Sequence, residues 1–360
     1  MSHRALELAA KAIGQVSPSP LVGCVIVSDS GEIVGEGTYY YDKTIHAEVI
    51  ALDQAGAMAD GATAYISLEP HSHHGRTPPC TDALIKAGIK RVVCPIEDPN
   101  PLVSGKGFET LRQNGIEVVT GVLKKEAEKL NEKFIHWHKN GRPFVHVKIA
   151  MSLDGKIATK KGESKWITGP GSRAVVQHLR HEYDAILVGG NTAFLDDPSL
   201  TDRSERMRHR KLVRIILDNS LRLPLRSQLV QSASKFPTIV FTNQGDSESK
   251  RRLEEYGVEI VETKEGGRDL RMVLKELGTR KIQSVLVEGG GEVAGSFHDA
   301  KLIDKVSFFV APIIIGGKEA PASIGGTGVK DLSRAMRLRT KDVIHRGEDI
   351  EVTGYPVWNE

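Results

Sequence analysis

The sequence predicts an α/β protein with two domains. At 360 residues the chain is too long for one ordinary hydrophobic core. Short apolar runs typical of buried strands alternate with segments of helical periodicity along its whole length. The pattern breaks at Gly141-Arg142-Pro143, after a charged helical segment. We therefore expect one domain over residues 1–141 and a second over residues 142–360.

The first half should fold as a small α/β layer. Leu6, Ala9 and Ile13 recur at helical spacing before Gly14, which predicts an opening helix. A hairpin should follow, in which residues 32–40 return along residues 21–27 through the turn at 28–31. The other expected elements are strands at 63–68, 91–94 and 117–120, and helices at 46–55, 80–87, 106–114 and 124–139.

The second half should fold around a mostly parallel sheet. Apolar runs predict strands at 144–150, 185–188, 213–217, 238–241, 284–287 and 306–310. Helical periodicity appears between them, at 172–180, 248–256 and 270–277. Such alternation is typical of parallel strands that are covered by helices on both faces.

Composition narrows the functional class. A net charge of +3, with 39% hydrophobic and 26% charged residues, is that of a soluble globular protein. Three cysteines, an odd number, favour a reducing compartment. No signal-peptide pattern opens the chain, and the apolar run at 306–315 is shorter than the ~20 residues of a membrane span. The basic cluster at 203–211 lacks interleaved aromatic residues. We expect a cytoplasmic protein that binds neither nucleic acid nor membrane.

The stretch from Ile45 to Cys80 has the pattern of a zinc site. It contains His46-Ala47-Glu48 and, later, Glu69-Pro70-His71 and Cys80. A catalytic zinc takes three protein ligands from imidazole and thiolate groups and keeps a fourth position open. His-x-Glu followed by a proline and further ligands is typical of nucleobase deaminases, in which the glutamate moves protons. We interpret His46, His71 and Cys80 as ligands and Glu48 as the general acid and base.

Several alternatives stay open within this stretch. His-x-Glu alone is also common at helix starts. His71, His73 and His74 are all candidates to meet the metal, although His73 and His74 fit better as substrate contacts or solvated loop residues. Cys24 and Cys94 lie in or beside apolar runs, where we expect small buried hydrophobic residues.

Two glycine turns in the second half suggest a dinucleotide site. Gly189-Gly190 and Gly289-Gly290-Gly291 each follow a predicted strand. Glycines let the backbone approach a pyrophosphate, and strand ends are where open α/β sheets bind ligands. Either run could instead be only a tight turn. No nucleophile system appears in this half, which is compatible with hydride chemistry carried by a nicotinamide.

Together these motifs resemble those of the bifunctional riboflavin biosynthesis protein family. Its members join a diaminohydroxyphosphoribosylaminopyrimidine deaminase to a 5-amino-6-(5-phosphoribosylamino)uracil reductase. The resemblance covers nearly the whole chain, through residues 46–49, 68–80, 98–101, 152–156, 162–168 and 196–201. It implies a cytidine-deaminase-like first domain and a dihydrofolate-reductase-like second domain. We also expect a homo-oligomer.

The resemblance also implies an activity and the residues that carry it. The first domain would use Zn²⁺ to deaminate 2,5-diamino-6-(5-phosphoribosylamino)pyrimidin-4(3H)-one by hydrolysis, and the second would use NADPH to reduce the ribosyl group to ribityl. The implied NADPH contacts are Met151, Trp166, Thr168, Thr192, Asp196, Ser220, Gly290, Gly291, Glu292, Val293, Ala294, Gly295 and Ser296. The implied substrate contacts are Ser164, Arg180, Leu200, Arg203 and Glu288, of which the arginines suit the phosphate.

The first half departs from the family pattern at three positions. His71 stands in place of a cysteine, Ser19 in place of an asparagine, and Tyr39 in place of a histidine. Imidazole can still ligate zinc, and the chain keeps His46, Glu48 and Cys80, which favours an active deaminase. The alternative is a reductase whose first domain does not deaminate. A nucleic-acid deaminase is disfavoured, because the second domain would then have no role.

Overall fold

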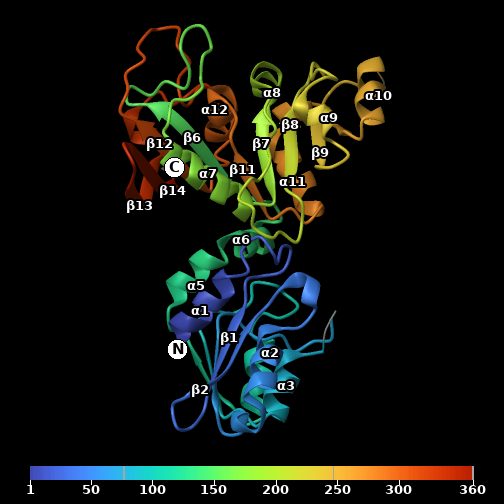
Figure 1. Ribbon diagram of the computed structural model, residues 1–360, viewed down its shortest axis with the longest axis vertical. Coiled ribbons are helices and arrows are strands. Elements are labelled where there is room, and N and C mark those ends of the chain that lie inside the picture. Colours follow the sequence, from blue (N-terminus) through green and yellow to red (C-terminus); the bar gives the residue numbers. More distant parts are fainter. Residues whose placement is uncertain (76–77, 246, 359–360) are drawn as a thin grey trace. The chain divides into compact units, whose positions relative to one another are not determined.

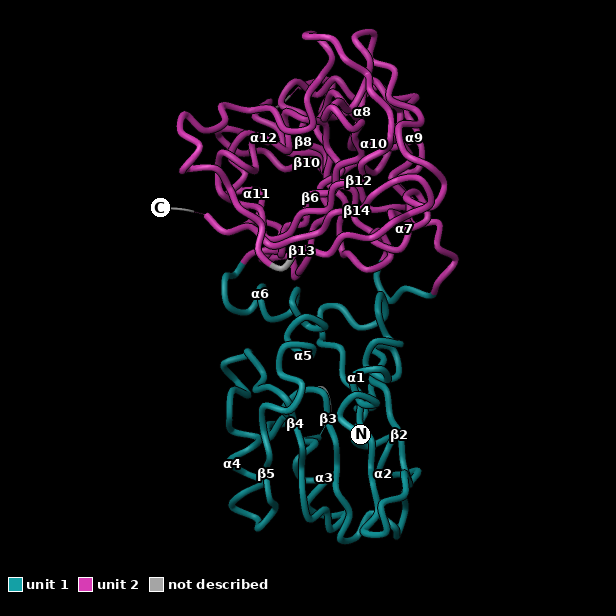
Figure 2. The backbone as a smooth tube through the Cα atoms, turned by 90° about the vertical axis from the view of Figure 1, so that its left-hand side faces the viewer, with its two compact units in different colours: residues 1–141, 207–210 teal, residues 142–206, 211–360 magenta. Residues whose placement is uncertain are grey.

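The chain divides into two compact units, which Figure 2 colours separately. Unit 1 comprises Met1–Gly141 and Met207–Arg210, and unit 2 comprises Arg142–Arg206 and Lys211–Glu360. The computed structural model describes residues 1–75, 78–245 and 247–358. Arg76 and Thr77, which belong to the run from Leu68 to Cys80, lie outside the described residues.

A five-stranded sheet organises unit 1, in the order β2-β1-β3-β4-β5. Its strands are β1 Gly23–Val27, β2 Ile33–Thr38, β3 Thr63–Ile66, β4 Arg91–Cys94 and β5 Glu117–Thr120. Strand β1 runs antiparallel to both β2 and β3, whereas β3, β4 and β5 are parallel. The predicted hairpin of β1 and β2 is therefore confirmed, and so are the other three predicted strands.

Six α-helices accompany this sheet within the described residues: α1 Ser2–Ala10, α2 Ala47–Ala55, α3 Cys80–Lys86, α4 Lys106–Gln113, α5 Lys124–Leu130 and α6 Glu132–Asn140. Helix α2 packs closely on β2, because a side-chain carbon at Gly37 would lie 1.9 Å from the carbonyl oxygen of Ala47. This contact fixes the first turn of α2 against the sheet.

The prediction of one helix over 124–139 is wrong. The segment breaks at Asn131, between α5 and α6. The buried side chain of Asn131 accepts a hydrogen bond from the Leu21 amide at 2.9 Å and donates one to the Leu21 carbonyl at 3.0 Å. This tertiary pairing, absent from any local pattern, holds the chain in a non-helical conformation there.

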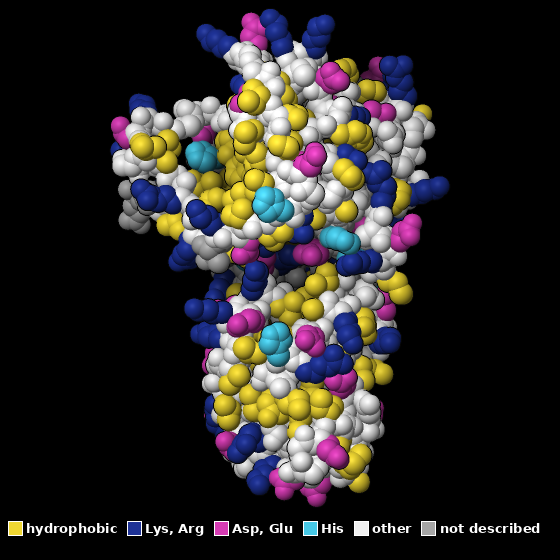
Figure 3. Space-filling model, turned by 60° about the vertical axis from the view of Figure 1, so that its left-hand side comes forward, with side chains coloured by type: hydrophobic (Ala, Val, Ile, Leu, Met, Phe, Trp, Pro, Cys, Tyr) yellow, Lys and Arg dark blue, Asp and Glu magenta, His cyan; other side chains and the backbone are white. Residues whose placement is uncertain are grey.

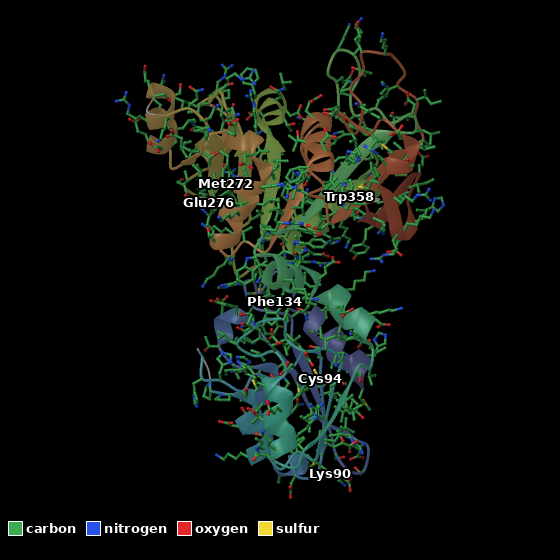
Figure 4. All side chains as sticks on the ribbon, turned by 180° about the vertical axis from the view of Figure 1, so that it is seen from behind. Lys90, Cys94, Phe134, Met272, Glu276 and Trp358 are labelled. Carbon is green, nitrogen blue, oxygen red and sulfur yellow. The ribbon has the colours of Figure 1, made fainter. Side chains whose placement is uncertain are left out.

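The core of unit 1 contains the two cysteines that the sequence assigned to packing. Cys24 and Cys94 are both fully buried, in one cluster with residues such as Ile26, Ala51 and Phe134. Figure 4 labels Cys94 and Phe134 within this unit. The prediction that both thiols are small buried hydrophobic groups is confirmed.

A nine-stranded sheet of the described residues organises unit 2, in the order β10-β9-β8-β7-β11-β6-β12-β14-β13. The strands are β6 Phe144–Ser152, β7 Ala185–Gly189, β8 Val213–Leu217, β9 Thr238–Thr242, β10 Glu259–Glu262, β11 Ser284–Val287, β12 Lys305–Ala311, β13 Arg337–Arg346 and β14 Asp349–Val357. All pairings from β10 to β12 are parallel, and β14 and β13 add an antiparallel end (Figure 1). The mostly parallel sheet is confirmed, whereas the sequence did not predict β10 or the β13–β14 hairpin.

Helices cover both faces of this sheet. Those of the described residues are α7 Pro170–Glu182, α8 Gly190–Asp196, α9 Gln228–Gln231, α10 Glu248–Glu255, α11 Leu270–Thr279 and α12 Gly291–Asp299. Along β7, Leu187 joins a buried cluster with Leu274 of α11, while its neighbour Val188 joins another with Leu253 of α10. Because successive strand residues point to opposite faces, both faces of β7 are buried. No helix of the described residues has the length and apolar character needed to span a bilayer.

Candidate active sites

Three predicted ligands meet at one point of unit 1. His46 directly precedes α2, Cys80 begins α3, and His71 lies in the loop between β3 and α3. Their potential ligand atoms all lie within 4.8 Å of one another. The imidazole rings of His46 and His71 have centroids 4.5 Å apart. The fold thus gathers two imidazoles and one thiol from three separate segments.

Glu48 lies in the first turn of α2, buried beside this group. Its side chain is only 2% exposed, and its Oε2 atom has no hydrogen-bond partner. Burial raises the pKa of Glu48, and hydrogen bonds with its own backbone amide and with Cys80 partly offset that effect. An unpartnered carboxylate oxygen in a buried position is unfavourable by itself. The arrangement therefore points to a function that uses this oxygen.

The donor set fits a zinc ion. Burial and the neighbouring His71 lower the pKa of His46 to about 4, so its imidazole is neutral, as a metal ligand must be. Burial, with the charge of Glu48, raises the pKa of the Cys80 thiol, and a bound cation would reverse this shift by favouring the thiolate. Two imidazoles and one thiolate leave the fourth tetrahedral position open.

The other two histidines of this stretch lie differently. His73 packs edge-on against His71, with ring centroids 5.3 Å apart, and its buried Nδ1 atom has no partner. His74 is exposed. Of the three histidines in the loop, His71 is the one grouped with His46 and Cys80.

The three positions at which we expect departures from the family pattern gather around the same group. The ring of Tyr39 lies 5.2 Å from that of His46, between centroids. The Tyr39 hydroxyl donates to Ser19 Oγ at 3.3 Å. Ser19, Tyr39 and His71 therefore form a connected set around His46, although the sequence separates them widely.

Glu69 is a supporting residue whose role the sequence analysis missed. Its buried carboxylate accepts hydrogen bonds from the amides of Asp98, Gly105 and Gly107, at 3.0, 2.9 and 2.9 Å. Glu69 therefore ties the loop before α4 to the segment that carries His71. The sequence did offer a signal for this role, because Glu69 is a carboxylate between the apolar residues Leu68 and Pro70, directly after a predicted strand.

Unit 2 contains a cavity of about 820 Å³ near the C-terminal ends of β6, β7 and β11. All five expected substrate contacts line it: Ser164, Arg180, Leu200, Arg203 and Glu288. Five expected NADPH contacts line it as well: Trp166, Thr168, Thr192, Asp196 and Gly290. The volume is in the range of cofactor and ligand pockets.

The other expected NADPH contacts lie outside the cavity lining. Met151 is near the end of β6, and Ser220 follows β8. Gly291, Glu292, Val293, Ala294, Gly295 and Ser296 form the start of α12. The two glycine turns follow neighbouring strands, β7 and β11, and a side-chain carbon at Gly189 or at Gly289 would lie 2.8 Å from Val293. Both turns thus pack against the start of α12, where a larger side chain would collide with Val293, and Gly290 lines the cavity beside them.

Glu288 is the centre of a charged cluster in this cavity. Nε and Nη2 of Arg180 donate to its carboxylate at 2.8 and 3.1 Å, and Lys148 Nζ donates at 3.4 Å. Burial favours protonation, but the charges of Arg180 and Lys148 prevail and lower the pKa of Glu288 to about 2. Lys148 also lines the cavity, and the sequence analysis missed it. Its position inside the apolar run 144–150 could have indicated a buried functional lysine.

Two family models match the chain. Residues 143–352 match the RibD C-terminal domain, and residues 1–96 match the cytidine and deoxycytidylate deaminase zinc-binding region. The riboflavin biosynthesis protein RibD of Actinobacillus pleuropneumoniae is 45% identical over 97% of this chain and 92% of its own. The riboflavin biosynthesis protein RibD of Aquifex aeolicus is 46% identical over 97% of this chain and 95% of its own.

Solved structures agree with these matches. Acinetobacter baumannii RibD superposes with a TM-score of 0.87 at 37% identity, covering 99% of this chain and 98% of its own. A diaminohydroxyphosphoribosylaminopyrimidine deaminase/5-amino-6-(5-phosphoribosylamino)uracil reductase from Thermotoga maritima superposes with a TM-score of 0.86 at 38% identity. The match covers 99% of this chain and 97% of its own. The chain belongs to the RibD family of bifunctional deaminase and reductase proteins of riboflavin biosynthesis.

Proposed function

We propose that residues 1–141 carry out the zinc-dependent deamination and residues 142–360 the NADPH-dependent reduction. The substrate would be 2,5-diamino-6-(5-phosphoribosylamino)pyrimidin-4(3H)-one, converted first to the uracil and then to its ribityl form. One observation carries the proposal: the buried, unpartnered Glu48 oxygen beside the group of His46, His71 and Cys80.

In the deaminase site, His46, His71 and Cys80 would hold the metal. Zinc, when bound, supplies a Lewis acid that makes water nucleophilic near neutral pH. Glu48 would take a proton from that water as the water oxygen adds to the ring carbon that bears the amine. Glu48 would then deliver the proton to the amine nitrogen, which leaves as ammonia. The raised pKa of Glu48 suits a group that must both accept and donate a proton.

In the reductase site, NADPH supplies the hydride when bound. The chain's own residues would position the opened ribose and its phosphate. Arg203 lines the cavity and offers a guanidinium to the phosphate. Glu288 is held ionised by Arg180 and Lys148, so it can orient sugar hydroxyls as an acceptor. The Lys148 ammonium lies in the same cavity and can donate to a ring carbonyl or sugar oxygen.

The test is zinc per chain, measured with ammonia release from the diaminopyrimidinone. We expect one zinc and ammonia release in the wild type, weakened zinc binding in His71→Ala, and retained zinc without turnover in Glu48→Ala. His74→Ala, which changes an exposed histidine of the same loop, is the matched control and should retain its zinc. Metal-free wild-type protein that still oxidises NADPH with the deaminated substrate would favour the alternative, a reductase with a non-deaminating first domain.

The proposed substrates are small phosphorylated pyrimidines. On the face shown in Figure 3, Lys and Arg are interspersed with Asp and Glu, without one continuous basic stripe. Steep salt dependence of RNA binding would contradict this choice of substrate. Homo-oligomeric assembly and a cytoplasmic location stay predictions from the sequence, which size-exclusion chromatography and cell fractionation would check.

A further inference from the structure

The loop after β8 is held in one conformation at the carboxyl edge of the unit 2 sheet. Asp218, only 4% exposed, accepts hydrogen bonds from the amides of Ser220, Arg222 and Leu223 at 3.2, 2.8 and 3.2 Å. Asn219 Oδ1 accepts from the Gly267 amide at 2.7 Å on the other side. The carboxylate of Asp218 is therefore turned inward and engaged, Leu221 and Leu223 are buried, and Ser220 and Arg222 are the exposed residues between Asn219 and Leu223.

Arg222 is the arginine of this loop that contacts the residues after β7. It is exposed, and its Nη2 donates to Asn191 Oδ1 at 2.7 Å. Its guanidinium lies 5.8 Å from the ring of Phe194, which is itself 46% exposed on α8. Among the described residues no carboxylate forms an ion pair with Arg222. The guanidinium is thus oriented by a neutral amide and an aromatic ring, and its positive charge is not neutralised.

This loop adjoins the NADPH cavity. Strands β7 and β8 are parallel neighbours, so the loops that follow them lie side by side. Thr192 lines the cavity, and the adjacent residue Asn191 accepts from Arg222. The residues proposed to hold substrate all line the cavity itself, whereas Arg222 lies beyond its lining, one strand further along the edge.

We infer that Arg222, oriented by Asn191, recognises the 2′-phosphate that distinguishes NADPH from NADH. A guanidinium matches phosphate oxygens in two parallel hydrogen bonds, and no outward-facing carboxylate of this loop opposes the anion. Ser220, two residues away, is already an expected NADPH contact, and its hydroxyl adds a donor of the right kind. The inference rests on the proposed reductase function and adds the residue that sets its choice of cofactor.

The test measures binding of NADPH and NADH to the full chain by calorimetry, without turnover. Arg222→Gln should weaken NADPH about 10- to 100-fold, as expected for losing charge-assisted hydrogen bonds, while NADH changes less than about threefold. Arg222→Lys should recover part of the NADPH affinity, because lysine keeps the positive charge but lacks the paired N–H donors of a guanidinium. Arg252→Gln, on the exposed side of α10, is the matched control and should leave both affinities unchanged.

The outcomes separate the two proposals. Equal losses for NADPH and NADH in Arg222→Gln, or no loss for either, would overturn the role of Arg222 and leave the reductase function standing. A wild-type chain that binds neither dinucleotide would contradict the reductase function itself. Selective loss of NADPH affinity supports both.

Discussion

The two units each bury a glutamate at the candidate site, but in opposite ways. Glu48 in unit 1 has an oxygen without a partner, and burial raises its pKa. Glu288 in unit 2 is buried too, yet Arg180 and Lys148 lower its pKa to about 2. The environment of this side chain therefore favours the protonated form in unit 1 and a fixed negative charge in unit 2. The difference lies in whether cations accompany the buried carboxylate.

Replacement of Glu48 should give the largest effect. Glu48→Gln keeps the shape of the side chain but cannot shuttle a proton, so ammonia release should fall about 10²- to 10⁴-fold. Zinc content and NADPH oxidation with the deaminated substrate should stay at wild-type values. Steady-state kinetics of both half-reactions, with metal analysis, measure this. If deamination survives within threefold, Glu48 is not the proton carrier.

Replacement of Glu288 should mainly cost stability of unit 2. Glu288→Gln removes the carboxylate that pairs with the buried Arg180 and Lys148, and breaking such a buried ion pair typically costs about 3–5 kcal/mol. Urea unfolding followed by hydrogen exchange on β6 and β11 should report the loss in this unit only. Exchange in unit 1 is the internal control, because its sheet is separate. An unchanged unit 2 would mean that solvent already compensates these charges.

Acid should remove the stabilising contribution of the Glu288 carboxylate. The folded pKa of Glu288, about 2, lies below its ordinary value of 4.5. Ionisation of Glu288 therefore stabilises the fold fully when the pH is above this ordinary value. That contribution is lost progressively as the pH falls from about 5 toward about 2. Unit 2 of Glu288→Gln should therefore lose less stability over this range than wild type. A parallel decline in both proteins would show that other groups dominate the acid response.

The contact between Tyr39 and Ser19 should give the smallest effect. Tyr39→Phe removes one neutral hydrogen bond of 3.3 Å, worth about 1 kcal/mol or less. A double-mutant cycle with Ser19→Ala, in which the thermal unfolding of unit 1 is measured for each variant, gives the interaction energy of this hydrogen bond. Zinc content should not change, because the ring against His46 is kept. Loss of zinc in Tyr39→Phe would show instead that the hydroxyl supports the metal site.

Much of the deaminase site could be predicted because its signals are local. His46 and Glu48 lie two residues apart at the start of α2, and Cys80 begins α3, where the sequence places helix starts. Buried strands such as β1, β4 and β7 were recognisable as apolar runs. The β13–β14 hairpin was missed because exposed charged residues interrupt its apolar ones, which weakens the hydrophobic signal at a sheet edge.

The sequence by itself determined the periodicity of most elements, the zinc-type donor set and the resemblance to a family. Only the tertiary structure decided which distant groups meet. Arg180 and Glu288 pair across 108 positions, Glu69 binds amides up to 39 residues away, and Asn131 ends α5 by bonding to Leu21. Such partners are set by which strand ends adjoin in the sheet. A local pattern carries no information on that order, because these buried polar groups come within reach of one another only when the layers pack.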